Sequence, residues 1–552
     1  MKKIVALLLV CVLILGLAAC GSSGSGDTKP ADEGEKQADT TPSGSDQTTP
    51  AGSDQTTPAD DGGDAAPAPD ESGSSRPLNI AVSEDHGTML PQAASGTGGM
   101  VSVIRAIYEP LIYQRKDGSF ENCLASEIEM LEDTHYVIHL REGVVFNNGN
   151  PFTAEDVMYT MELYHGHPRH GMVVGYVDFD KTKIVDDYTI DLWLTQYSII
   201  QFPALTQMYI HDAESYNEEE LALHPITTGA YEVTDYVVNS HITLEARDDY
   251  WGDPPAIKNI NFTFMTEDAQ RVNALTTGDA DIARIPMKDV EYVESLDDYT
   301  VNLSFAAQAD CAYLNMSKGA PLETLEAREA FMMAIDRQAI VDLVYCGNSS
   351  VPNWPVSEYN VDYNPATMSG IDEAYIKGYD PVRAKELAEQ SGLVGKTLRI
   401  ATNGSADAVT MAEMMQYDLE EIGVHAQILT FDQATYFSDL MDASNFDVGI
   451  YFIANTIGSA ADLFANYPLF FQCGWEGPER DEFLALGQKA ITTIDDAERG
   501  KILEELVHRF AKVNIWFAIS ELVNVNAHNV HLAGMEYYLD GSTSYNKWYW
   551  TN

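Results

Sequence analysis

A long segment without large apolar side chains limits where this chain can fold. From Gly21 to Ser75 the sequence has no Ile, Leu, Val, Met, Phe, Tyr or Trp, and "GSDQTTPA" occurs twice in tandem. Such a segment cannot build a hydrophobic core, so we expect it to be disordered. Folding is therefore confined to Arg76 onward, about 477 of the 552 residues, enough for two or three domains.

The residues before this segment have the features of a secretion signal. Two lysines precede an apolar run from Ile4 to Ala19, which is shorter than the ~20 residues that a helix needs to cross a bilayer. The stretch "LAAC" resembles a bacterial lipobox, which implies lipidation of Cys20 and cleavage behind Ala19. The alternative is an ordinary signal peptide that happens to contain Cys20.

We therefore predict a lipoprotein signal over residues 1–19 and a lipidated tether over 20–75. As a flexible coil the tether has an end-to-end distance of roughly 40 Å. The folded part is then expected to hang from the outer face of the cytoplasmic membrane. A tether of this length suits a cell with one membrane and a thick wall.

Deleting residues 21–75 is expected to leave the melting temperature of the folded part unchanged, because the segment has no large apolar side chains to bury. The check is a thermal melt of the shortened chain beside the full mature chain. A shift of several degrees would show that the segment docks on the folded part.

Charge and cysteine content exclude some classes of function. The folded part carries 28 basic and 73 acidic side chains, a net charge near −45, so it should repel nucleic acid. Its four cysteines form no C-x-x-C pair, which argues against a zinc or redox centre, and their three possible disulfide connectivities stay open. They are Cys123, Cys311, Cys346 and Cys473.

From Arg76 onward the sequence alternates between strand and helix patterns. "PLNIAVS" predicts an opening strand, and Tyr136, Ile138 and Leu140 alternate as in a second one. Further positions are typical of helix ends and caps. These are Thr153, Thr266, Asp336 and Asp380 as N-caps, Pro381 at a first helical position, and Gly278, Gly392 and Gly423 at C-terminal ends. Strands that alternate with helices of this length indicate mixed α/β layers.

Motifs for catalysis and metal binding are weak. The chain contains neither H-E-x-x-H nor G-x-S-x-G, and "GKT" at 395–397 lacks the first glycine of a phosphate-binding loop and begins a strand pattern. His165, His167 and His170 crowd one loop and could bind zinc, nickel or copper if it folds back. A polar surface loop is the commoner outcome for such a cluster.

Four motifs in order resemble the family 5 extracellular solute-binding proteins of bacterial ABC importers, the oligopeptide, dipeptide and nickel group. They are "YVIHLREGVVFNNGNPFTAEDVMYTMEL", "TGAYEV...ARDDYWG", "LNMSKGAPLETLEAREAFMMAIDRQAIV" and "YDPVRAKELAEQSG". The resemblance covers residues 77 to 540 and implies an α/β, bilobed periplasmic-binding-protein-like type II fold with an extra subdomain inserted in the first lobe. We expect crossing strands near "CAYLNMS" and "WFAISELVNV". The expected boundaries are 76–110, 223–307 and 521–552 for the first lobe, 111–222 for the inserted subdomain and 308–520 for the second lobe.

The resemblance also implies a function. The chain would be a substrate-binding lipoprotein, not an enzyme, which captures an oligopeptide or dipeptide by lobe closure and delivers it to a membrane permease. We expect a monomer without a cofactor, with the solute, the permease and, through Cys20, the membrane as partners. Alternatives are a receptor for a nickel chelate on the same fold and a secreted peptide hydrolase, for which no catalytic constellation is found.

The chain departs from the family at the expected ligand site. Peptide-binding members carry a segment like W-x-x-D-x-x-D-P, whose aspartate pairs with the α-ammonium group of the peptide. Aligned from the preceding strand, those positions fall on Ile453, Thr456 and Ser459, so the carboxylate is missing. Substitutes are Asp462 and Asp85. The candidate ligand-binding residues are Asp85, His86, Trp354, Phe452, Asn455, Thr456 and Asp462, and the aromatic side chains of Tyr451 and Trp475 could line the site or belong to the core.

Overall fold

The structure is a computed structural model in which part of the chain is described. The described residues are 76–92, 99–167, 170–352, 360, 362, 378–432, 435–436, 440, 445–454, 459–470, 473–539 and 542–551. They all belong to the unit 66–552, so Cys20 and the predicted tether lie outside them. Within these ranges no helix combines the length and the apolar character that a membrane crossing requires.

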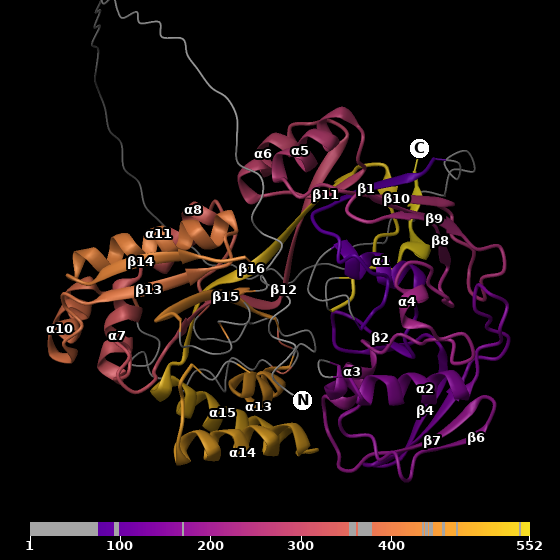
Figure 1. The fold of residues 1–552 in the computed structure, drawn as a ribbon, viewed down its shortest axis with the longest axis horizontal. Coiled ribbons are helices and arrows are strands. Elements are labelled where there is room, and N and C mark those ends of the chain that lie inside the picture. The colour runs from indigo at the N-terminus through magenta and orange to yellow at the C-terminus, as the bar shows by residue number, and fades with distance from the viewer. Residues whose placement is uncertain are drawn as a thin grey trace, which may run out of the picture. The chain divides into compact units, whose positions relative to one another are not determined.

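A large mixed sheet organises the described part of the chain (Figure 1). The predicted mixed α/β layers are confirmed, and neighbouring strands run parallel from β14 to β15 and from β11 to β10. The ten strands in spatial order are β14 (His425–Thr430), β13 (Thr397–Thr402), β15 (Val448–Ala454), β12 (Tyr299–Leu314), β16 (Trp516–Asn529), β11 (Ile282–Arg284), β1 (Leu78–Val82), β10 (Asn259–Phe264), β9 (His241–Ala246) and β8 (Tyr231–Val237).

Two long antiparallel strands, β12 and β16, join the two ends of this sheet. We call β11, β1, β10, β9 and β8 the first half-sheet, and β14, β13 and β15 the second half-sheet. β16 pairs with the first half-sheet through β11, and β12 pairs with the second through β15. The prediction of crossing strands in these regions is confirmed, although β12 begins well before the "CAYLNMS" segment.

A separate four-stranded antiparallel sheet lies between α1 and β8 in the sequence. Its inner face shares a core with α2 and α3 of the same region. Its strands are β4 (Ala125–Glu132), β5 (His135–Leu140), β7 (Thr189–Trp193) and β6 (Lys183–Asp186), and the helices are α2 (Ala154–His165), α3 (Gln201–Leu205) and α4 (Glu218–Leu221).

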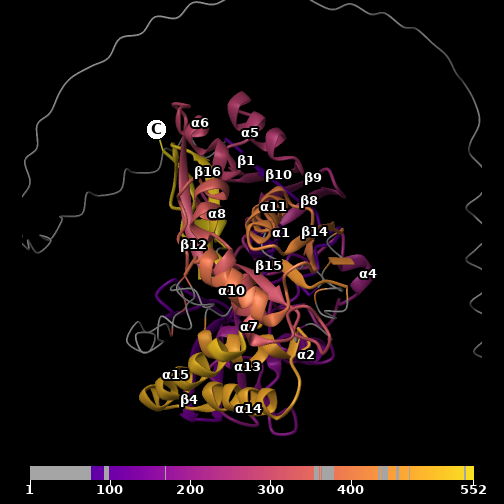
Figure 2. The same ribbon diagram turned by 90° about the vertical axis from the view of Figure 1, so that its left-hand side faces the viewer.

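Helices cover both faces of the sheet around β12 and the second half-sheet. The side chains of β12 alternate between the two faces and so enter two different cores. Ala309, Cys311 and Tyr313 join the core of α13 (Ala460–Phe470), α14 (Pro478–Thr492) and α15 (Asp496–Val513). Ala312 and Leu314 join the other core. That core holds α7 (Leu325–Ala334), α8 (Arg337–Val344), α10 (Pro381–Ser391) and α11 (Ala406–Glu421). Figure 2 shows α13, α14 and α15 grouped together, apart from α11.

The first half-sheet has its own helices and a third core. α1 (Gly99–Ile107) contributes Val103 and Ile107 to that core, while α5 (Asp268–Thr277) and α6 (Val290–Glu294) pack with the second core. Two short strand pairs complete the described elements: β2 (Ile112–Gln114) with β3 (Phe120–Asn122), and β17 (Leu532–Ala533) with β18 (Tyr549–Trp550).

Most of the predicted helix ends are confirmed. Asp380 caps α10 by accepting from the backbone N–H of Arg383, Pro381 is the first helical residue, and Gly392 ends the helix with φ +72°. The cap predicted at Thr266 is wrong by one residue, because Glu267 is the N-cap of α5. The carbonyl of Thr266 instead accepts a hydrogen bond from a guanidinium, which holds that residue in the turn before the helix.

The motif "ARDDYWG" joins the segment between β5 and α2 to the first half-sheet. The guanidinium of Arg247 donates to the carbonyl oxygens of Thr227 and Val145, at 3.1 and 3.0 Å. Tyr250 Oη and Trp251 Nε1 each donate to the buried carboxylate of Glu109 at 2.8 Å. This family motif therefore has a structural role in the chain.

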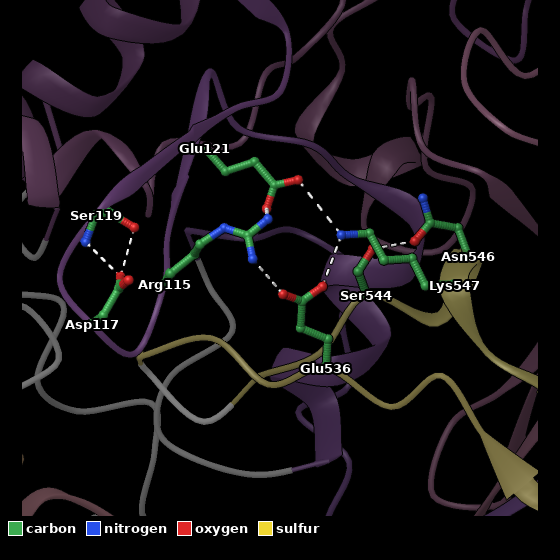
Figure 3. Close-up of polar contacts among 8 residues, drawn as sticks. All are labelled: Arg115, Asp117, Ser119, Glu121, Glu536, Ser544, Asn546 and Lys547. Atoms are coloured by element: carbon green, nitrogen blue, oxygen red, sulfur yellow. Dashed lines mark hydrogen bonds and ion pairs between the residues drawn. The ribbon is translucent and has the colours of Figure 1, made fainter. Parts of the chain in front are cut away.

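Ion pairs tie the C-terminal segment to the β2–β3 hairpin (Figure 3). Arg115 pairs with Glu121 at 2.9 Å and with Glu536 at 2.7 Å, and Lys547 reaches the same two carboxylates at 3.5 and 2.9 Å. These side chains are partly exposed, so each pair stabilises the fold by no more than about 1 kcal/mol.

The four cysteines of the folded part are all free thiols in the structure. Cys123, Cys311 and Cys473 are buried, whereas Cys346 is exposed. Burial raises the pKa of the Cys473 thiol to about 12. The three buried thiols therefore act as small apolar side chains.

Candidate ligand-binding site between the half-sheets

The directions of the strands bring two sets of strand ends face to face. β12 runs from the first half-sheet into the second. β11 runs in the same direction, since both are antiparallel to β16, so its last residue, Arg284, points toward the second half-sheet. β15 runs the opposite way and ends at Ala454, opposite Gln308. In open α/β sheets ligands bind at the carboxyl ends of parallel strands.

The segment between these two sets of strand ends is irregular. Phe305 pairs with Val523 and Ala309 with Glu521, so three residues of β12 lie opposite one of β16. The alignment shifts again after Asp310. Bulges of this kind bend strands and weaken pairing locally. We call this segment, Phe305–Cys311 of β12 with Ala518–Val523 of β16, the joint between the half-sheets, and its strands are bent by the bulges.

A buried arginine shapes the edge of the first half-sheet. Arg271 of α5 donates through Nε to the carbonyl of Arg284 at 2.8 Å, and through Nη1 to the carbonyls of Met265 and Thr266 at 2.7 and 3.0 Å. It also pairs with the carboxylate of Asp268. These contacts fix the ends of β10 and β11 relative to each other and leave the side chain of Arg284 exposed.

A carboxylate lies in the middle of the joint. Asp310 Oδ2 accepts hydrogen bonds from Ser520 Oγ at 2.8 Å and from the hydroxyl of Tyr345, which follows α8. The pKa of Asp310 is raised to about 6, chiefly by burial, with the two hydroxyl donors and Arg284 lowering it and the charge of Asp407 raising it. Asp310 thus links α8, β12 and β16 where the strands bend.

The end of β15 leads into a helix whose N-terminus holds another carboxylate. Asp362 accepts from the backbone N–H groups of Ala460 and Ala461, at 2.6 and 3.1 Å, and from Ser459 Oγ at 2.8 Å. Ser459 is one of the positions where the family aspartate was expected. A carboxylate from elsewhere in the chain is therefore present there, but its charge is stabilised by the helix N-terminus.

Asp462, one proposed substitute for that aspartate, is almost completely buried in the first turn of α13. Asn466 Nδ2 donates to its Oδ1 at 2.6 Å. Burial raises the pKa of Asp462 to about 6, Asn466 lowers it, and the charge of Asp362 raises it. Burial raises the pKa of the Tyr176 phenol, and the charge of Asp462 raises it as well, so Asp462 lies near Tyr176.

Asp85, the other substitute, is engaged within the first half-sheet. Its carboxylate accepts from Tyr236 Oη at 2.8 Å and from the backbone N–H groups of Asn239 and Gly87, at 2.6 and 2.8 Å. His86 lies 3.5 Å from the carboxylate of Glu84 and is mostly buried. Both residues lie in the segment after β1, at the carboxyl end of a parallel strand.

The aromatic candidates divide between the site and the core. Phe452 is partly buried near the end of β15 and stacks on Tyr451 with ring centroids 4.5 Å apart. Trp475 is buried against Phe483 and belongs to the core. Trp354, Asn455 and Thr456 lie outside the described residues.

The three loop histidines make separate contacts. The ring of His165 packs on Phe179 at 4.7 Å, while the rings of His167 and His170 lie 5.1 Å apart. The backbone N–H of His170 donates to His167 Nδ1 at 3.2 Å. Across the described ranges, no group of three or more His, Cys, Asp or Glu side chains is placed to hold a metal ion.

Sequence reasoning missed the polar residues of the joint and of the facing strand ends. Gln308 and Asp310 interrupt an otherwise apolar strand, "AAQADCAYL", and that interruption could have pointed to them. Asp407 and Arg284 carry no comparable signal, because only the folded sheet brings them near Asp310.

Comparison with known proteins places the chain among solute receptors. Residues 119–478 match the model of the bacterial extracellular solute-binding proteins, family 5. The glutathione-binding protein GsiB of Escherichia coli O157:H7 is 24% identical over 483 residues, 82% of this chain and 91% of that protein.

Solved structures show the same fold. DppA from Helicobacter pylori, in complex with the peptide STSA, has a TM-score of 0.74 at 22% identity over 86% of this chain and 98% of its own. NikA from Brucella suis, in complex with Fe(III)-EDTA, has a TM-score of 0.77 at 18% identity over 86% of this chain and 100% of its own. These proteins have the bilobed type II fold that the motifs predicted. The chain therefore belongs to the family 5 bacterial extracellular solute-binding proteins of ABC importers.

Proposed function

We propose that this solute-binding protein captures a short peptide, or a solute of similar size, and delivers it to a membrane permease for import. The observation that carries the proposal is the pair of facing strand ends joined by the bent strands β12 and β16. A ligand that contacts both sets of ends favours the state in which they are close together. That closed state is the form that a permease can distinguish from the free receptor.

The proposed lobes keep the boundaries expected from the sequence. The first lobe is 76–110, 223–307 and 521–552, the second is 308–520, and the inserted subdomain is 111–222. The peptide class is supported by relatives described as binding glutathione and the peptide STSA. Anchoring through Cys20 would keep the receptor beside its permease on the outer face of the membrane.

The test is mass spectrometry of the solute that co-purifies with the protein, followed by calorimetry with the identified compound. We expect intact peptides that bind with one-to-one stoichiometry. Prolonged incubation with the same peptides should return them unchanged. The appearance of shorter products would contradict the proposal and favour a peptide hydrolase.

A second candidate is a metal-chelate receptor on the same fold. It is favoured by the contact between His167 and His170 and by the similarity to NikA in complex with Fe(III)-EDTA. Metal analysis of the purified protein, with and without alanine at His165, His167 and His170, distinguishes it. Stoichiometric metal that the triple change removes would favour this candidate over the peptide receptor.

Acetylating the terminal amine of a bound peptide with neutral side chains is expected to weaken binding by less than ~10-fold, about 1.4 kcal/mol. The reason is that Thr456 and Ser459 replace the expected acids, and Asp362, beside Ser459, is already engaged by the α13 N-terminus. Calorimetry with matched free and acetylated peptides measures the effect. A hundredfold loss would reveal a strong amine anchor, to be sought with Asp462→Asn and Asp85→Asn.

A further inference from the structure

A row of side chains crosses the joint on one face of the sheet. Gln308 and Asp310 of β12 lie opposite Ala454 and Phe452 of β15, in a ladder without irregularity. Residues two apart in a strand point to the same face, so Gln308 and Asp310 share one face. Asp310 and Phe452 are both partly exposed. The row therefore reaches the surface between the facing strand ends.

Two acceptor atoms in this row have no donor among the described residues. Gln308 is 4% exposed, and its Oε1 has no hydrogen-bond partner among the residues that the structure describes. Both hydroxyls that bind Asp310 donate to Oδ2, which leaves Oδ1 without a described donor. A buried acceptor without a donor costs about 1–3 kcal/mol. The row is therefore suited to a partner that is rich in N–H groups.

A second carboxylate adds negative charge beside this row. Asp407 lies in the first turn of α11, directly after the carboxyl end of β13, and its charge acts on Asp310 and on Tyr345. Across the joint, Arg284 and Lys288 attract Asp407 electrostatically. Neither cation lies within ion-pairing distance of Asp407 or Asp310 in the described part of the chain.

The two carboxylates act on each other as like charges, since the charge of Asp407 raises the pKa of Asp310. Burial raises the pKa of Asp407, as does the charge of Asp268, while Arg284 and Lys288 lower it. Asp268 itself is paired with Arg271. Asp310 is partly buried and Asp407 is exposed, so a positive group beside both would reduce the repulsion between their like charges.

Building on the receptor function proposed above, we propose that Gln308, Asp310 and Asp407 form a subsite for a positively charged side chain of the solute, a lysine ammonium or an arginine guanidinium. The amide oxygen and the two carboxylates offer acceptors, and each such cation offers several N–H donors. An acidic group would instead meet Arg284 and Lys288 and leave these acceptors unmatched.

Three tripeptides that differ in one side chain test the subsite by calorimetry near neutral pH: Ala-Lys-Ala, Ala-norleucine-Ala and Ala-Glu-Ala. We expect the lysine peptide to bind about tenfold more tightly than the norleucine peptide, and the glutamate peptide to bind least. Asp407→Asn should reduce the preference for lysine to less than about threefold, with little effect on the norleucine peptide. Glu413→Gln removes an exposed carboxylate from the same helix and should leave the preference unchanged.

The preference for lysine should also fall with pH. A bound cation favours the charged carboxylate, so binding is tightest above the pKa of the free protein and weakens as the carboxylate becomes protonated. Asp310 has a pKa of about 6, so the preference should shrink several-fold between about pH 7.5 and about pH 5. The charged and titratable groups around it are Tyr345, Asp407 and Arg284.

Several results would overturn the subsite. Equal affinity for the lysine and norleucine peptides would show that the protein does not recognise the positive charge. Tighter binding of the glutamate peptide would show that Arg284 and Lys288, rather than the carboxylates, determine the charge preference. A loss of both neutral and charged peptides in Asp407→Asn would show a structural role. Failure of all three peptides to bind the unaltered protein would overturn the peptide proposal itself and, with it, this subsite.

Discussion

Replacing Glu109 by leucine is expected to lower the free energy of unfolding by about 3 kcal/mol, because two buried donors lose a charged acceptor. Tyr250 Oη and Trp251 Nε1 both donate to the Glu109 carboxylate at 2.8 Å, and Glu109 is 4% exposed. Leucine fills a similar volume but accepts no hydrogen bond. Burying a carboxylate itself costs free energy, so its removal offsets part of the loss. The expected change in the free energy of unfolding is therefore smaller than the contribution of two charged hydrogen bonds. Urea denaturation of both proteins gives the value.

The matched control for this change is Glu142→Leu. Glu142 is exposed, so the same substitution there should change the free energy of unfolding by no more than about 0.5 kcal/mol. Equal effects at the two positions would mean that the loss at Glu109 does not come from its buried hydrogen bonds.

The loss in free energy of unfolding caused by Glu109→Leu should become smaller as the pH rises. Burial raises the pKa of Glu109, while hydrogen bonds from Trp251 and Tyr250 lower it. The carboxyl is therefore protonated more readily in the folded protein, and its contribution to stability is greatest below the unfolded pKa of about 4.3. That contribution falls as pH rises through the folded pKa. The difference between the two proteins should thus shrink from about pH 4 to about pH 8, and a difference that grows would contradict the raised pKa.

Local features of the fold could be predicted because their causes lie within a few residues. Asp380, Pro381 and Gly392 each act on the backbone of the helix that they flank, so the sequence pattern around them determines both ends of α10. The N-cap predicted at Thr266 was wrong by one residue, because the Thr266 carbonyl takes part in a hydrogen bond that the local cap pattern does not include. Arg271 takes the carbonyl of Thr266 while it ties β10 to β11.

The candidate site could be predicted only in part, because its residues meet through pairings between distant strands. Gln308 lies opposite Ala454 only in the register of β12 and β15, and that register depends on two separate cores. Asp362 reaches Ser459 from 97 residues away in the sequence. The missing family aspartate was visible in the sequence, whereas the carboxylate that lies beside its position was not.

The bent joint connects the fold to the proposed function. Ligand contacts at both sets of strand ends can bias the arrangement of the half-sheets only if β12 and β16 yield between them. The bulges between Phe305 and Cys311 interrupt the pairing of these two strands, and Asp310 binds Tyr345 and Ser520 at the same place. The subsite proposed above therefore lies where a bound cation would act directly on the joint.

Replacing Cys20 by alanine is expected to abolish stable membrane attachment and to leave the folded part intact. In the proposed lipoprotein the acyl chains on Cys20 supply the attachment, at about 0.8 kcal/mol for each buried methylene group, and alanine has no sulfur to carry them. The net charge of −53 also opposes retention at an anionic membrane surface.

The measurement for Cys20→Ala is detergent-phase partitioning of the chain after removal of the signal, with mass spectrometry of its N-terminus. We expect the altered chain in the aqueous phase, alongside some unprocessed precursor, and the unaltered chain in the detergent phase with a lipid mass on Cys20. Ser22→Ala, which changes the tether two residues further on, should behave like the unaltered chain. Complete partitioning of signal-free Cys20→Ala into detergent would show that the attachment lies elsewhere, because a solvated acidic protein without an acyl chain has no affinity for the micelle interior.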